Sequence, residues 1–138
     1  MAIHCKNESS HFGWQQWRWA KLLRLAKTHG WEVMGTSQPP EEEIHFPGGR
    51  WDANNYTTND GQIVSAADAA ALATALERAL PHIPDADALA KYRLPDGGIE
   101  IAPHAPPAPD ADWFSGVEAK AHVVRFIAFC REGSFRIY

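Results

Sequence analysis

Cysteine is scarce in this sequence, and its two copies lie far apart. Cys5 and Cys130 form neither a CxxC pair nor the regular array of a small secreted domain. This scarcity excludes a disulfide framework and a zinc knuckle. It is typical of reduced thiols in the cytosol, so we expect a cytoplasmic protein.

Long hydrophobic runs are absent as well. The apolar stretches are much shorter than a membrane span, and the N-terminal MAIHCKNESS lacks the apolar segment of a secretory signal. No charge of one sign dominates either, since the formal net charge is only −4. Such a chain has no global field that would gather phosphates. We therefore expect no membrane association, and nucleic-acid binding is disfavoured.

The sequence does contain enough apolar material for a core. Its 138 residues are 45% hydrophobic and 11% aromatic, which favours one domain. The segment PHAPPAP (103–109) has four prolines and predicts an extended connection at about 103–112. The residues after it are too few to fold alone, so this connection is not a domain boundary.

A first helix is predicted from Trp14 to His29. This segment has no Gly or Pro, and Gly30 follows it as a stop signal. At 100° per residue, one side is expected to face the core. That side holds Gln15, Trp19, Leu22, Leu23 and Ala26. The other side holds Trp14, Trp17, Arg18, Lys21, Arg24 and Leu25.

Several short segments predict strands. WEVMGT (31–36) and the closing SFRIY are two of them. The β-branched and aromatic residues of 56–58 and 62–64 predict a hairpin around the turn Asn59-Asp60-Gly61. Ser65, with Asp68 three residues on, predicts the N-cap of a second helix. The expected apolar stripe of that helix is Ala69, Leu72, Ala73, Leu76 and Leu80.

A third helix is predicted after Ser115, up to about Glu132. Ser115 and Glu118 have the spacing of a capping box. The expected core stripe is Val117, Ala121, Val124, Ile127 and Ala128, widened by Val123, Phe126 and Cys130. The fold class is therefore α+β and mainly α, with three main helices packed on a small antiparallel sheet or hairpin.

Local catalytic and metal motifs are missing. No segment has the ligand spacing of a calcium loop, and the single glycine of the 52–62 loop cannot form a phosphate cradle. The seven histidines show neither HxxxH nor HExxH, and there is no GxSxG. Cys130 lies on an apolar helix face and is expected to be inert core, and His122 could pair with Glu118. We predict no cofactor and no metal.

Two surfaces are candidates for binding. On the first helix, aromatic and cationic side chains alternate, as in many protein interfaces and in some nucleic-acid sites. These residues are Trp14, Trp17, Arg18, Lys21 and Arg24. The second candidate is the polar hairpin, with Tyr56, Asn59 and Gln62. A simpler alternative for the helix is that EEEIHFPGGRW (41–51) folds across it and pairs its glutamates with the cations.

The order of segments resembles a family of small bacterial proteins of unestablished function. The resemblance rests on the Trp-rich first helix ending in Gly30-Trp31, on YTTNDGQIVSAADAAALATALERAL, and on the closing FIAFCREGSFRIY, where Ser134 replaces an expected glycine. It carries over no catalytic residues. Together with size and charge, it suggests a protein-binding module of the immunity or accessory type. Two alternatives stay open: a small enzyme with its site at residues 52–68, and a homodimer.

Overall fold

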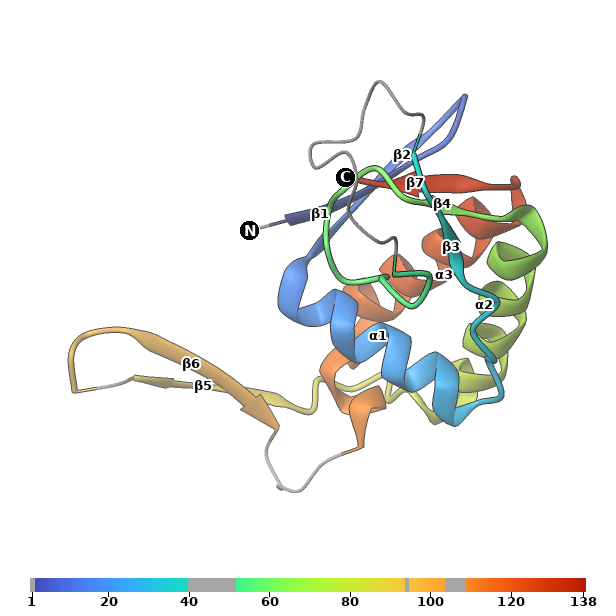
Figure 1. Cartoon of the computed structure of the whole chain (residues 1–138). Helices are drawn as coiled ribbons and strands as arrows, with labels where there is room; N and C mark the ends of the chain where they lie inside the picture. The colour runs from blue at the N-terminus through green and yellow to red at the C-terminus, as the bar shows by residue number, and fades with distance from the viewer. Residues whose placement is uncertain (1, 40–51, 94, 104–108) are drawn as a thin grey trace.

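The computed structural model describes residues 2–39, 52–93, 95–103 and 109–138. Three α-helices hold more residues than the strands do, in agreement with the predicted α+β, mainly α class. They are α1 (Gln16–Thr28), α2 (Ala66–Ala79) and α3 (Val117–Arg131). They pack against one antiparallel sheet, which lies across the top of the view in Figure 1.

The sheet has five strands in the order β2-β1-β7-β4-β3. Their bounds are β1 (Ala2–Lys6), β2 (His11–Gln15), β3 (Thr36–Ser37), β4 (Ile63–Val64) and β7 (Phe135–Ile137). The predicted C-terminal strand is confirmed. It lies in the centre, where Cys5 of β1 is opposite Ile137 and Val64 of β4 is opposite Phe135.

The first helix begins later than predicted. Trp14 belongs to β2, where it lies opposite Ile3 and is only 4% exposed. The turn between β1 and β2 is held by the Asn7 side chain, whose Oδ1 accepts the amides of Ser9 (2.9 Å) and Ser10 (2.6 Å). Pairing with β1 therefore overrides the helical propensity of this segment.

The core side of α1 differs slightly from the prediction. Trp19, Leu22, Leu23 and Ala26 are buried as expected. Gln15 precedes the helix and is exposed, whereas Leu25 is buried. The predicted cap of α2 is confirmed, because Ser65 Oγ accepts from the Asp68 amide at 3.1 Å. The stripe of α2 is also buried, except for the partly exposed Leu80.

The third helix is rotated relative to the prediction. Its buried side chains are Val123, Phe126, Ile127, Phe129 and Cys130. Val117 and Val124 are 74% and 48% exposed. The phenylalanines have more apolar area to bury than the valines, so the aromatic side of the helix faces the core.

The predicted capping box is also wrong. Gly116 is the N-cap and makes no side-chain cap bond. Ser115 Oγ instead accepts from the Ala88 amide at 2.8 Å and donates to the Asp112 carbonyl at 2.6 Å. The serine side chain thus links the segment before β5 (Leu89–Arg93) to η3 (Asp110–Phe114) and does not cap the helix.

The predicted hairpin at 56–64 is wrong as well. Residues 56–58 form no strand, and β4 pairs with β3 and β7 instead. Of the predicted strand WEVMGT, only Thr36 lies in a strand. The segment 56–62 is a loop because its backbone groups are bonded by side chains, as described below.

A second, two-stranded sheet extends away from the helices in Figure 1. Its strands are β5 (Leu89–Arg93) and β6 (Ile99–Pro103). Sequence patterns did not predict this ribbon. It is followed by the 3-10 helix η3 (Asp110–Phe114), so residues 110–112 of the predicted extended connection are helical instead. Residues 104–108 of that connection lie outside the described residues.

The rotation of α3 gives a direct test of the core. Val123→Asp puts a charge at a position that is 0% exposed, and we expect it to lower the free energy of unfolding by several kcal/mol, about 3 or more. Val124→Asp changes an exposed neighbour and should leave the melting temperature nearly unchanged. Urea unfolding measures the free energy of unfolding of both variants. Equal losses in the two would contradict the assigned core side of α3.

Candidate binding surface

Aromatic and cationic side chains from α1 and η3 meet on one face. Trp17, which is 39% exposed, packs edge-on against Trp113 with ring centroids 5.5 Å apart. Lys21 Nζ lies 4.2 Å from the centre of the Trp113 ring, and the Arg18 guanidinium lies 5.0 Å from that of Trp17. We call Trp17, Arg18, Lys21 and Trp113 the aromatic–cationic patch.

Two of the predicted first-helix residues lie outside this patch. Trp14 is a correction, because its position in β2 buries the ring between Phe114, His122 and Phe126. Arg24 forms an ion pair with Asp110 at 2.8 Å, which ties α1 to η3. The arginine side chain is 60% exposed, so water screens the pair and its contribution to stability is small.

Trp113 is the member of the patch that sequence reasoning missed. It follows the proline-rich segment, and no periodicity in the sequence relates it to the first helix. The predicted cover, EEEIHFPGGRW, lies outside the described residues. Whether that segment crosses the patch therefore stays a prediction.

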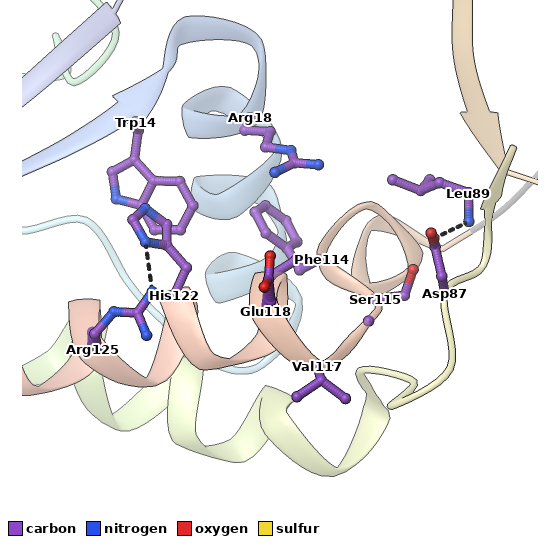
Figure 2. A pocket seen from close by; sticks show the side chains of 12 residues that line it. Trp14, Arg18, Asp87, Leu89, Phe114, Ser115, Val117, Glu118, His122 and Arg125 are labelled. Carbon is purple, nitrogen blue, oxygen red and sulfur yellow. Dashed lines mark hydrogen bonds between the residues drawn. The ribbon is translucent and has the colours of Figure 1, made fainter. Parts of the chain in front are cut away.

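A cleft of about 630 Å³ opens beside the patch. Arg18 of α1 reaches over it, the first turns of α3 form its floor, and the segment leading to β5 closes its far side (Figure 2). The charged side chains along it are Arg18, Asp87, Glu118 and Arg125. Because opposite charges are present in equal number, the cleft as a whole does not select for one sign of charge.

His122 lies at the inner end of this cleft. Its Nε2 donates to the Gly13 carbonyl at 3.1 Å, so its Nδ1 is free to accept from Arg125 at 3.5 Å. Burial lowers the pKa of His122, and the charges of Arg125 and Arg18 add to this effect. The imidazole is therefore neutral at pH 7. The predicted pairing with Glu118 is not formed.

Arg18 is the least satisfied cation of the cleft. Partial burial lowers the pKa of its guanidinium, and the charge of Asp87 only opposes that shift. Its Nε is buried and has no hydrogen-bond partner in the described part of the chain. No described carboxylate lies within ion-pair distance of it. Arg18 thus retains hydrogen-bonding capacity where the patch and the cleft meet.

Tyr56, predicted as a binding residue, is part of the protein interior. Its hydroxyl donates to Asp68 at 2.7 Å and accepts the Gly35 amide at 2.8 Å. Trp31 Nε1 donates to the other Asp68 oxygen at 2.9 Å. Burial raises the pKa of Tyr56, and its hydrogen bond to Asp68 raises it further. These bonds connect α2 to the segment before β3.

Gln62, also predicted as a binding residue, is fully buried. Its side-chain amide donates to the carbonyls of Asn55 (3.1 Å) and Thr58 (2.7 Å), and its oxygen accepts the Asp60 amide at 2.9 Å. It therefore satisfies the backbone of the 55–60 loop. Only Asn59 of the three predicted residues is exposed. A catalytic site at residues 52–68 loses its main candidates.

The described residues contain no cluster of three or more His, Cys, Asp or Glu that could hold a metal ion. Cys5 and Cys130 are both buried, and burial raises the pKa of each thiol. The prediction that Cys130 belongs to the core is confirmed, and a buried thiol of raised pKa is expected to react slowly. No described helix has the length and apolar character needed to cross a bilayer.

No family model, curated protein or solved structure matches this chain. The resemblance to small bacterial proteins therefore stays a prediction.

The internal role of Tyr56 can be tested by Tyr56→Phe. This change removes the hydroxyl that bonds to a buried Asp68 oxygen and to the Gly35 amide, and both groups lose that hydrogen-bond partner. The free energy of unfolding should therefore fall by about 1–3 kcal/mol. Chemical denaturation measures the loss. Asn59→Ala, which changes an exposed residue of the same region, is the control, and equal stability of the two variants would contradict the assignment.

The lowered pKa of His122 predicts a pH dependence of stability. Between the folded-state pKa and the ordinary value of about 6.5, only the unfolded chain binds the proton, so stability falls as pH decreases. His122→Gln keeps a donor for the Gly13 carbonyl but cannot titrate. From pH 7.5 to 5.5, the wild type should therefore lose more unfolding free energy than the variant. Parallel losses would show that His122 does not titrate as inferred.

Proposed function

We propose that this protein is a binding module that docks another protein on the aromatic–cationic patch. One observation carries the proposal: the half-exposed Trp17 ring packs on Trp113 and is flanked by two cations. Tryptophan and arginine are, with tyrosine, the side chains enriched at the energetic centres of protein interfaces.

The packing of the patch favours tight docking. The Trp17 and Trp113 rings already support each other at 5.5 Å, so their rotamers are restricted before a partner arrives. Binding then costs less side-chain entropy. Residues of this kind contribute more than an isolated exposed side chain such as Met34, which is 58% exposed.

The charges of the patch indicate the chemistry of its partner. Arg24 is neutralised by Asp110, but no described carboxylate forms an ion pair with Arg18 or Lys21. A partner with acidic groups around an apolar centre would complement this arrangement. Two cations are few for a phosphate backbone, so nucleic acid stays disfavoured. An immunity or accessory role in a bacterial cytoplasm is the version of this proposal that the family resemblance supports.

A paired capture experiment tests the proposal. Tagged wild type, Trp17→Ala and Met34→Ala would be incubated with lysate of the native host, and retained proteins identified. We expect a partner that is bound by the wild type and by Met34→Ala but lost with Trp17→Ala. With the purified partner, calorimetry should show affinity reduced by about 2 kcal/mol or more for Trp17→Ala, which is roughly thirtyfold.

The choice of variant matters for this test. Trp14→Ala is unsuitable because Trp14 is buried and its loss would disturb the core. Melting curves must first show that Trp17→Ala remains folded. A partner that binds the wild type and Trp17→Ala equally would exclude the patch as its docking surface.

A further inference from the structure

The outward side of α3 carries a row of apolar residues that are wholly or partly exposed to solvent. We call it the α3 seam, and its members are Val117, Ala121, Val124 and Ala128. Val117 and Val124 are 74% and 48% exposed, Ala128 is exposed and Ala121 partly exposed. The spacing i, i+4, i+7, i+11 aligns the four on one line along the helix. Such a line is typical of the contact between two packed helices.

The small size of these side chains sets how closely a second helix could approach. Valine and alanine form a low ridge, so the two axes can come to the short end of the usual 8–10 Å separation. A loop or a sheet would contact only part of this straight ridge. A helix with equally small side chains fits the seam best.

The charges beside the seam are paired on one flank and unpaired on the other. Toward α2, Lys120 binds Asp85 at 3.0 Å and Arg131 binds Glu77 at 2.8 Å. Toward the cleft, Glu118 and Arg125 form no ion pair with any described residue. Both project from the cleft side of α3 in Figure 2. The seam thus has one acidic and one basic group on the same flank.

We propose that the α3 seam binds the α3 seam of a second copy of this chain, with the two helices antiparallel about a two-fold axis. In an antiparallel symmetric pair, each flank faces its own copy. In the register where Ala121 meets the partner's Val124, Val117 meets the partner's Ala128. The same register brings Glu118 opposite the partner's Arg125, with an axial offset of about 3 Å.

The agreement between the apolar register and the charge register favours a second copy as the partner of the seam. A single register aligns all four apolar residues and also pairs the two unpaired charges, twice over because of the symmetry. The seam is short and its side chains are small, so the interface is below the standard size. The dimer is accordingly weak and depends on concentration. It uses none of the aromatic–cationic patch residues, so the two surfaces can be tested separately.

A charge swap tests the proposal in the full chain. Sedimentation velocity over a concentration series would be run for the wild type, Glu118→Arg, Arg125→Glu and the double variant. Each single change places like charges opposite each other and should weaken the dimer about tenfold or more. The double variant restores opposite charges and should recover the wild-type dimer.

Two further variants complete the design. Val124→Asp places a charge at the centre of the seam, outside the core, and should abolish the dimer. Met34→Asp changes an exposed apolar residue elsewhere, 58% exposed against 48% for Val124, and should not. Melting curves establish that each variant is folded. A wild type that stays monomeric at all concentrations, a dimer insensitive to Val124→Asp, or a double variant no better than the single ones would each overturn the proposal.

Discussion

The sheet depends on the central strand β7. Phe135 and Ile137 are buried against the helices, while the backbone of this strand binds β1 on one side and β4 on the other. The Tyr138 amide donates to the His4 carbonyl at 2.7 Å, and the Ile137 amide donates to the Gln62 carbonyl at 3.0 Å. Without these bonds, the N-terminal hairpin and the β3–β4 pair would be two separate pieces, each too small to be stable alone.

The parts of the fold that follow local rules could be predicted from the sequence. The cap at Ser65 and the stripe of α2 depend on residues within a few positions of one another, and both predictions are confirmed except for the partly exposed Leu80. The fold class followed from the number of such helices. Where a segment is hydrogen-bonded to residues far away in the sequence, the local pattern predicted the wrong secondary structure. Trp14 has helical neighbours, yet its place is fixed by Ile3 across a strand pair.

The same limit applies to the candidate site. The sequence pattern predicted that Trp17 and Lys21 share one face of α1, and the structure confirms this because helical geometry puts both beside Trp113. Their partner Trp113 comes from another element and could not be located. For Tyr56 and Gln62, polar character suggested a surface role, but their hydrogen bonds are to the protein itself. A single sequence does not distinguish a polar group that binds a ligand from one that satisfies a buried backbone.

The position of β7 also governs the order of folding events. On the ribosome, β1 and β4 are synthesised well before β7, the strand that lies between them in the sheet. The helices α1 and α2 can form from local contacts during that interval, but the facing edges of β1 and β4 stay unpaired. Sheet closure therefore requires contacts between residues far apart in the chain, which are the slow contacts in folding. Until it occurs, the nascent chain exposes two strand edges that chaperones or other chains could bind.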